Sequence, residues 1–316
     1  MVTVTVLMAV YDTPAAMLDR AIESIRRQTL RDFEFLILDD GSRSEDTRAC
    51  LLRHAAADSR IRLWPESHRG LTRTLNCGLA LASGAFIARQ DADDWSEPER
   101  LERQIAFFDA HPEIALCGTG AWVHQEDGSR LWPVRMPETA EEIAAALLKG
   151  NPFLHGSAMF QTAAGRALGG YREEFPYSQD YDFFWRLSET GGTANLAQPL
   201  YHYRYAGGAV SAGRAEEQAQ AHRAAQKLAE ARRRGQPENV AQALAEAGQE
   251  IAAGPGAFRA ALKQADHRML AGDYRGAGHA YGRLLAQNPR SALAWGKLAR
   301  WAVFAAVPPA REACFR

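Results

Sequence analysis

The sequence predicts an α/β domain built on a mainly parallel sheet, followed by an all-α region. Over the first hundred residues, short apolar and β-branched runs alternate with segments that have apolar residues at helical spacing. Strands separated by helices imply right-handed βαβ units, whose strands lie parallel in one sheet. From Arg214 onward the chain is rich in Ala, Arg, Glu and Gln without a strand pattern, so we expect four or five helices there.

The first half of the α/β region is expected to begin with a core strand over residues 1–10. This segment has neither the basic region nor the cleavage site of a signal peptide. Thr13 and Pro14 suit an N-cap and the first position of the next helix, which carries an apolar stripe. Further strands are predicted at 33–38, 61–64 and 85–88, and further helices at 47–57 and 71–82.

The second half is predicted to open with a capping box over residues 96–99, which begins a helix that ends near Ala110. A strand over 114–123 and a tight turn at Asp127 and Gly128 follow. Helices are then expected at 138–148 and 180–190, and strands at 157–160 and 200–204.

Composition excludes several classes of protein. Lys and Arg total 37 against 38 Asp and Glu, so nothing attracts the chain generally to nucleic acid or anionic membranes. No apolar run is long enough for a membrane-spanning helix. The four cysteines are Cys50, Cys77, Cys117 and Cys314. They lack paired spacing, which indicates reduced thiols in a cytoplasmic protein.

Two acidic clusters each follow a predicted strand, at residues 39–40 and 91–94. Ligands of parallel sheets bind beyond the carboxyl ends of the strands. Carboxylates are suitable ligands for hard divalent cations, which can neutralise a leaving diphosphate. Taken alone, three aspartates in four residues also fit a solvated loop that caps a helix.

The segment 88–104, which contains the Asp91-x-Asp93 motif, strongly resembles inverting family 2 glycosyltransferases, which have the GT-A fold. This nucleotide-sugar transferase fold is a Rossmann-like mixed sheet flanked by helices. Further segments resemble the same family in the same order, at 7–12, 36–42, 70–80, 151–160 with 169–172, and 178–187. The resemblance implies a catalytic domain over 1–212, with a nucleotide-sugar half at 1–95 and an acceptor half at 96–212. The helical region then covers 213–316.

The resemblance also implies roles for individual residues. Asp93 is expected to bind Mn²⁺ or Mg²⁺ directly, and Asp180 is expected to act as the general base. Gln179, which precedes Asp180, cannot titrate, so the base role falls on the aspartate. Asp39 or Asp40 would accept a hydrogen bond from the imide of uracil or thymine. The expected nucleotide-sugar contacts are Ala9, Tyr11, Asp12, Asp39, Asp40, Arg73, Asp91 (to the ribose) and Ala92.

Several of these residues also have a structural interpretation. Asp94 is assigned to local structure, and Asp180 could instead cap the helix that follows it. Arg73 could approach the diphosphate or lie on a helix surface. His155 fits a contact on the acceptor side and a core histidine equally well.

The segment 202–205 opens a further part of the resemblance. Arg204 could neutralise phosphate, and Gln179 lies on the acceptor or phosphate side. Many relatives carry a histidine two residues after the tyrosine–arginine pair, but Ala206 stands there in this chain. That departure leaves a third protein ligand of the metal in doubt, and His202 is not expected to replace it.

The helical region has two open interpretations. Residues 270–274 and the helices around them resemble a tetratricopeptide (TPR) helix pair, although about one repeat is covered, and a helical cap on the catalytic domain is the alternative. The last helix, with Trp295 and Trp301, could pack inward. It could also lie on a membrane surface near a lipid-linked acceptor.

Two other classes of function are alternatives for this sequence. A dinucleotide-dependent oxidoreductase would need a glycine fingerprint, and Gly118-Thr119-Gly120 lacks the third glycine and opens no helix. An inactive scaffold that recruits a partner through its tail is the second. We expect instead a cytoplasmic hexosyl- or N-acetylhexosaminyltransferase, with peripheral attachment to the inner face of the membrane as an option. It would use a UDP-sugar and a saccharide or lipid-linked saccharide acceptor in bacterial surface-polysaccharide biosynthesis.

Overall fold

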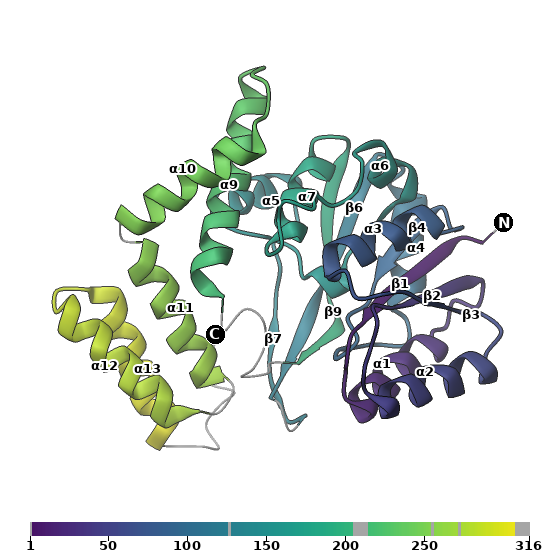
Figure 1. The fold of residues 1–316 in the computed structure, drawn as a ribbon, viewed down its shortest axis with the longest axis horizontal. Helices are drawn as coiled ribbons and strands as arrows, with labels where there is room; N and C mark the ends of the chain where they lie inside the picture. Colours follow the sequence, from purple (N-terminus) through teal and green to yellow (C-terminus); the bar gives the residue numbers. More distant parts are fainter. Residues whose placement is uncertain (1, 126–127, 205–213, 254–255, 271–272, 307–316) are drawn as a thin grey trace. The chain divides into compact units, whose positions relative to one another are not determined.

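The computed structural model describes residues 2–306 except 126–127, 205–213, 254–255 and 271–272 (Figure 1). The chain divides into two compact units. One comprises Met1–Trp122 and Pro133–Tyr203, and the other comprises Val123–Trp132 and Arg204–Arg316. The predicted domain boundary at residue 212, and with it Ala206, lies outside the described residues.

The first half of the sheet is parallel, as predicted. Its strands are β1 (Val4–Val10), β2 (Phe33–Asp39), β3 (Ile61–Pro65) and β4 (Phe86–Arg89), in the spatial order β3-β2-β1-β4. The helices between them are α1 (Ala15–Arg26), α2 (Glu45–Ala57) and α3 (Leu71–Leu81). Each of these elements lies within three residues of its predicted range, because the apolar periodicity of each segment matches its buried face.

The second half turns the sheet into a mixed one, which extends from β4 in the order β4-β8-β6-β9-β5. Its strands are β5 (Trp95–Ser96), β6 (Ile114–His124), β8 (Met159–Gln161) and β9 (Gly192–Arg204), with β7 (Arg130–Val134) paired to β6. Its helices are α4 (Arg100–Ala110), α5 (Ala140–Leu147), the 3₁₀ turn η1 (His155–Ser157), α6 (Thr162–Ala167) and α7 (Gln179–Ser188). Strand β8 runs antiparallel to β4 and β6, which confirms a mixed sheet flanked by helices.

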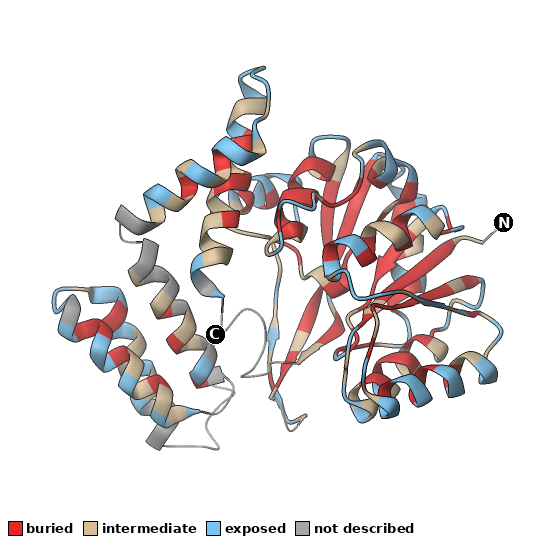
Figure 2. Ribbon diagram, in the orientation of Figure 1, coloured by how far each residue is buried: buried red, intermediate tan, exposed pale blue. Residues whose placement is uncertain are grey.

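The core lies on both sides of the sheet (Figure 2). The predicted apolar stripe of α1 is fully buried, at Leu18, Ala21, Ile22 and Ile25. Strand β1 is buried almost throughout, as expected for a central parallel strand covered by helices on both faces. Cys50, Cys77 and Cys117 are free thiols, as predicted, and Cys314 lies outside the described residues.

The predicted capping box at residues 96–99 is wrong. Ser96 lies on β5, paired with Tyr201 of β9, and its Oγ donates a hydrogen bond to Gln90 Oε1 over 2.7 Å. Helix α4 begins only at Arg100, and no side chain caps it. The pairing of β5 with β9 therefore places the Ser96 hydroxyl against Gln90, whereas the local sequence pattern predicts that this hydroxyl caps the helix. A capping box is present at α5, where Thr139 and Glu142 bond reciprocally.

A buried ion pair fixes the position of α7. Asp182 is 1% exposed, and its carboxylate lies 3.0 Å from Arg172 Nη1 and 2.8 Å from Arg186 Nη2. The Arg186 guanidinium also donates to the backbone carbonyls of Leu168 and Gly170, so its charge is well satisfied. These contacts hold the start of α7, where the predicted general base lies.

The second unit contains five helices within the described residues: α9 (Ala215–Arg233), α10 (Val240–Ala253), α11 (Gly256–Leu270), α12 (Tyr274–Gln287) and α13 (Ala292–Ala306). Helices α11 to α13 share a small apolar core around Met269, Tyr281 and Leu285. Trp301 packs against this core and donates its indole N–H to Tyr274 O, whereas Trp295 is 54% exposed. The likeness to a TPR pair stays a prediction, and part of its turn lies outside the described residues.

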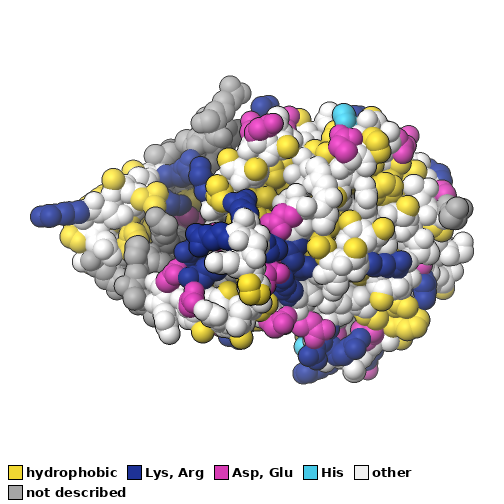
Figure 3. Space-filling model, turned by 90° about the horizontal axis from the view of Figure 1, so that it is seen from above, with side chains coloured by type: hydrophobic (Ala, Val, Ile, Leu, Met, Phe, Trp, Pro, Cys, Tyr) yellow, Lys and Arg dark blue, Asp and Glu magenta, His cyan; other side chains and the backbone are white. Residues whose placement is uncertain are grey.

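No helix among the described residues has both the length and the apolar character needed to cross a bilayer. Basic and acidic side chains lie close to one another on the face shown in Figure 3. This mixture agrees with the formal net charge of -1.

Replacing Asp182 with Ala should lower the free energy of unfolding by about 3–5 kcal/mol, because the buried Arg186 guanidinium and the partly buried Arg172 guanidinium would lose their carboxylate partner. Urea unfolding followed by tryptophan fluorescence would measure the change. Glu173→Ala is the matched control, since it removes the exposed Glu173–Arg73 pair, which should contribute about 0–1 kcal/mol. Equal effects of the two substitutions would contradict this assignment.

Candidate active site

The carboxyl ends of three neighbouring parallel strands bring the predicted nucleotide-binding residues to one edge of the sheet. Strand β1 lies between β2 and β4, and its last residue, Val10, pairs with Asp39. Tyr11 and Asp12 therefore follow β1 beside Asp40, and Asp91 follows β4 on the other side. This is the edge at which α/β sheets bind their ligands.

The two aspartates after β2 are buried and bonded within the loops of this edge. Asp39 Oδ1 accepts a hydrogen bond from the Ser42 backbone N–H over 2.9 Å. Asp40 accepts from the backbone N–H groups of Arg69 at 2.7 Å and Gly70 at 2.9 Å, and it lies 2.9 Å from His68 Nδ1. Asp39 thus shapes the loop between β2 and α2, and Asp40 shapes the loop before α3. The contact of either carboxylate with a nucleobase stays a prediction.

The loop after β1 is fixed by Asp12. Its backbone is left-handed, with φ 47°, and its carboxylate accepts hydrogen bonds from the backbone N–H groups of Arg43 and Ser44. The Ser44 N–H is the main reason that the pKa of Asp12 is lowered. Tyr11 is 38% exposed and stacks on His68, with ring centroids 4.0 Å apart. An aromatic face that stays partly exposed at this edge is suited to stacking with a nucleobase.

The acidic loop after β4 divides into exposed and buried carboxylates. Asp93 is exposed, whereas Asp94 is 2% exposed, in keeping with its assignment to local structure. Asp91 Oδ1 accepts a 2.7 Å hydrogen bond from the buried Arg89 guanidinium. Burial, and after it the charges of Asp94, Asp93 and Asp91, raise the pKa of Tyr203.

Gly156 allows the backbone of η1 to approach this loop closely. A Cβ atom at this position would lie 1.9 Å from Tyr201 Oη and 2.7 Å from Asp91 Oδ2. The Tyr201 hydroxyl in turn accepts the Asp91 backbone N–H over 3.2 Å. Any side chain at residue 156 would therefore displace the acidic loop.

Asp180, the predicted general base, lies in the first turn of α7. Its Oδ2 accepts a 2.8 Å hydrogen bond from the side-chain amide of Asn151. The alternative that Asp180 caps this helix is wrong, because the N-cap position belongs to Ser178, whose φ is 55°. The neighbouring Gln179 is 6% exposed. Asp180 is half-buried, so part of its side chain is accessible to a ligand.

Three further residues of the sequence analysis are Arg73, His202 and Arg204. Arg73 forms an exposed ion pair with Glu173 over 2.8 Å, which favours the helix-surface interpretation. His202 pairs with Glu97 Oε1 over 2.8 Å and stacks on Trp95, so its ring has structural partners. Arg204 is the half-buried last residue of β9.

Two small residues and one histidine complete the predicted set. Ala9 is half-buried near the end of β1, and Ala92 is 8% exposed within the acidic loop. His155 lies on η1 and contacts Arg89 and Tyr171 through its Nε2 atom. Burial first, and the Arg89 charge second, lower the pKa of His155, so it is neutral at neutral pH.

The donor set of the acidic loop fits the predicted divalent cation. The exposed Asp93 carboxylate and Asp91 Oδ2, the oxygen that Arg89 does not bond, are hard oxygen ligands. Mg²⁺ and Mn²⁺ need few protein ligands when substrate phosphates and water complete the coordination shell.

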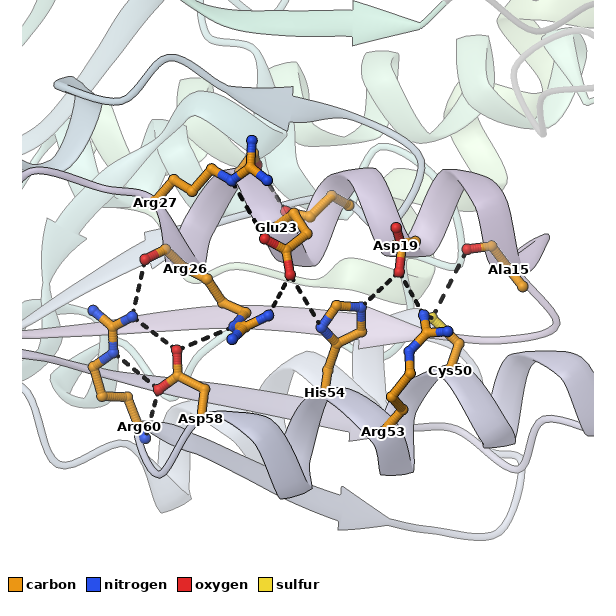
Figure 4. A network of polar contacts seen from close by, with 12 residues as sticks. Ala15, Asp19, Glu23, Arg26, Arg27, Cys50, Arg53, His54, Asp58 and Arg60 are labelled. Atoms are coloured by element: carbon orange, nitrogen blue, oxygen red, sulfur yellow. Dashed lines mark hydrogen bonds and ion pairs between the residues drawn. The ribbon is translucent and has the colours of Figure 1, made fainter.

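Among the described residues, one group of three side chains has the spacing of a metal site, and it lies elsewhere: Asp19, Cys50 and His54 on α1 and α2. In Figure 4, the Arg53 guanidinium donates to both Asp19 and Cys50, and His54 lies between Asp19 and Glu23. Because Arg53 already supplies the positive charge there, this group needs no metal ion.

Sequence reasoning missed several residues that the fold brings to the site. They are Arg89, Asn151, Tyr171, Tyr201 and Tyr203. Arg89 offered a signal, since a cation that ends an apolar strand directly before an acidic loop is unusual. The others come from segments that are distant in sequence, and nothing in the local pattern links them to the acidic loop.

Residues 5–167 match the family described as Glycosyl transferase family 2. That match covers more than half of the chain. This protein belongs to glycosyl transferase family 2. The glycosyltransferase is 35% identical over 205 residues to EpsE of Bacillus subtilis (strain 168), covering 64% of this chain and 72% of EpsE. It is 31% identical over 188 residues to the amylovoran biosynthesis glycosyltransferase AmsE of Erwinia amylovora, covering 59% of this chain and 70% of AmsE.

Solved structures support the GT-A fold of this glycosyltransferase. A crystal structure of S. aureus TarS residues 1–349 in complex with UDP-GlcNAc has a TM-score of 0.60 at 17% identity, covering 90% of this chain and 83% of that one. The mannosyltransferase PcManGT of Pyrobaculum calidifontis, in complex with GDP-Man and Mn²⁺, has a TM-score of 0.56 at 19% identity. That match covers 98% of this chain and 81% of PcManGT. At this identity the likeness concerns the fold alone.

Replacing Gly156 with Ala should weaken nucleotide-sugar binding more than about tenfold, because the new methyl group forces Asp91 and Tyr201 apart. Isothermal titration with UDP-GlcNAc would measure the affinity. Gly282→Ala is the control, since a Cβ there meets no atom within 4 Å and the residue lies inside α12. It should leave binding unchanged and stabilise the helix by about 0.5–1 kcal/mol. Unchanged binding by Gly156→Ala would show that the loop tolerates displacement.

Proposed function

We propose that this glycosyltransferase transfers a hexose or N-acetylhexosamine from a UDP-sugar to a saccharide or lipid-linked saccharide, with inversion and with the help of a divalent cation. The names of its relatives support a place in bacterial surface-polysaccharide biosynthesis. AmsE is named for amylovoran biosynthesis, and WbnJ of Escherichia coli, 31% identical over 206 residues, is named for O-antigen biosynthesis. The acceptor and the donor sugar are part of the proposal.

One observation carries this proposal. The short segment 151–156 meets both carboxylates: Asn151 donates a 2.8 Å hydrogen bond to Asp180 Oδ2, and a Cβ atom at Gly156 would lie 2.7 Å from Asp91 Oδ2. The predicted base and the predicted ribose contact therefore lie at the two ends of one short segment. Direct transfer by an inverting enzyme needs that arrangement, because the donor must lie between its nucleotide contacts and the base that activates the acceptor.

The chemistry then proceeds by single displacement. The acceptor hydroxyl oxygen attacks the anomeric carbon, the bond from that carbon to the diphosphate oxygen breaks, and the hydroxyl proton passes to Asp180. Asn151 holds Asp180 Oδ2 from one side, so Oδ1 is left to take the proton. A cation held by Asp93 would neutralise the negative charge that develops on the leaving diphosphate.

A large pocket beside the proposed base supports an acceptor site. Its volume is about 930 Å³, and it lies between the linker after β7, helix α5 and the loop 149–152. Asn151 lines this pocket and also donates to Asp180, so an acceptor in the pocket would be one residue away from the base. Apolar atoms of Met136, Pro137 and Ala145 lie beside polar groups, which is the mixed surface that a sugar ring needs.

Filling this pocket should reduce transfer and leave the donor site intact. Ala145→Trp is expected to raise KM for the acceptor more than about tenfold, because the indole would occupy space that the acceptor needs. Transfer from UDP-GlcNAc to a panel of p-nitrophenyl glycosides would measure KM, and UDP affinity would report on the donor site. Ala144→Trp is the control, because it adds the same indole to the same helix at an exposed residue outside the lining. Equal kinetics of the two variants would exclude the pocket as the acceptor site.

UDP at a hundred times its dissociation constant should stabilise the protein by about 2.7 kcal/mol, a rise of several degrees in Tm, when Mn²⁺ is present. Asp93→Ala should abolish the manganese-dependent part, because it removes the proposed ligand. Differential scanning fluorimetry with UDP, TDP, GDP and ADP would measure this. Asp109→Ala, an exposed aspartate on α4, should behave as the wild type. The absence of a response to every nucleotide would favour the alternative of an inactive scaffold.

Asp180→Asn should lower kcat by about 10²–10⁴-fold, because the amide cannot take the acceptor proton. UDP-GlcNAc affinity should stay within about twofold of the wild type, since Asp180 does not contact the nucleotide in this proposal. Release of UDP, measured with a coupled assay, and isothermal titration would separate the two effects. A variant that retains full activity would remove Asp180 from the mechanism.

A further inference from the structure

The buried guanidinium of Arg89 connects β1, the acidic loop and η1. Arg89 is 0% exposed. Its Nη1 donates to the backbone carbonyl of Leu7, its Nη2 donates to Asp91 Oδ1 over 2.7 Å, and its Nε donates to His155 Nε2 over 3.1 Å. Each nitrogen of the guanidinium therefore has a partner in a different segment.

The last of these bonds fixes the protonation state of His155. An arginine Nε–H can only donate, so Nε2 of His155 must offer its lone pair and carry no proton. A neutral imidazole has one N–H, which therefore lies on Nδ1. The Tyr171 hydroxyl, 3.1 Å from the same Nε2, is compatible with this tautomer because it can donate as well.

The Nδ1–H group of His155 is available to a ligand. Among the described residues, no hydrogen bond to this nitrogen is found, and it is absent from the buried polar atoms that lack a partner. It is therefore accessible to solvent. His155 directly precedes Gly156, where a Cβ atom would lie 2.7 Å from Asp91 Oδ2, and it follows Asn151, which donates to Asp180 Oδ2, by four residues. His155 therefore belongs to the segment between the proposed nucleotide contact and the proposed base.

We propose that His155 donates its Nδ1–H to an oxygen of the transferred sugar, and that Arg89 is the positioning residue that fixes this tautomer. This inference rests on the proposed function, and it assigns His155 to the sugar part of the donor. A neutral N–H donor suits a hydroxyl or carbonyl oxygen of a sugar, because it adds no charge next to a metal-bound diphosphate. Arg89 also holds Asp91, so one buried cation aligns the contacts to ribose and sugar.

The contact can be measured by comparing the affinity for UDP-sugars with the affinity for UDP. A contact to the sugar adds to the affinity for UDP-GlcNAc, and to that for UDP-glucose, but not to that for UDP. His155→Gln offers an oxygen to Arg89 and has no N–H at the Nδ1 position. It should lower UDP-sugar affinity by about fivefold, the effect of one lost hydrogen bond, and leave UDP affinity unchanged. Isothermal titration calorimetry with the UDP-sugar and with UDP, each in the presence of Mn²⁺, gives the two dissociation constants.

Two variants control this comparison. His155→Asn places an amide N–H near the position of Nδ1 and should recover most of the UDP-sugar affinity. His111→Gln makes the same exchange at an exposed histidine at the end of α4 and should change neither constant. Equal losses of UDP and UDP-sugar affinity by His155→Gln would overturn the sugar contact. Binding of no nucleotide by the wild type would instead overturn the proposed function.

The tautomer is tested without any ligand. Nitrogen-15 NMR of histidine-labelled protein distinguishes protonated Nδ1 from protonated Nε2, and His155→Gln identifies the signal of His155. We expect a single Nδ1–H form at pH 7.5 in the wild type. Arg89→Lys should give a mixture of tautomers, because the ammonium group does not reproduce the fixed Nε–H. A protonated Nε2 in the wild type would overturn the inference.

Discussion

The burial of the Arg89 charge is the constraint on which the proposed reaction site depends. A guanidinium that is fully removed from water is stable only where hydrogen-bond acceptors surround it, and the partners of Arg89 come from β1, the acidic loop and η1. A second buried guanidinium, that of Arg100, donates to the carbonyls of Gly156 and Arg89. Burial lowers the pKa of Arg100 to about 10, so it remains charged at neutral pH. The two cations thus tie the acidic loop to η1 through bonds that leave little freedom.

The two halves of the sheet contribute different parts of the site. The parallel half places the ends of β1, β2 and β4 side by side, which gathers backbone N–H groups and carboxylates at one edge. The antiparallel half adds β8 beside β4, with Ala88 paired to Met159. That pairing brings η1 next to Arg89, although the two are separated by about sixty residues of chain. A site with a donor side and an acceptor side is assembled in this way from two kinds of strand pairing.

Many polar groups at this edge are bonded within the loops themselves. Asp12, Asp39 and Asp40 accept backbone hydrogen bonds from neighbouring loops, so a substitution at any of them changes loop geometry together with any ligand contact. Asp93 differs, because it is exposed in a loop whose next residue, Asp94, is buried. Sequence proximity alone could not separate these neighbours, since adjacent residues of a loop often point in opposite directions.

The sequence by itself determined the family, the order of most strands and helices, and the acidic residues at the sheet edge. These follow from local periodicity and from motifs that stand in continuous stretches of chain. Only the tertiary structure decided that Ser96 belongs to a strand, that Ser178 and not Asp180 is the N-cap of α7, and that Arg89 donates a hydrogen bond to His155. The physical reason is that a hydroxyl, a carboxylate or a guanidinium bonds to the partner that the fold brings to it. That partner can lie sixty residues away, where no local pattern can reveal it.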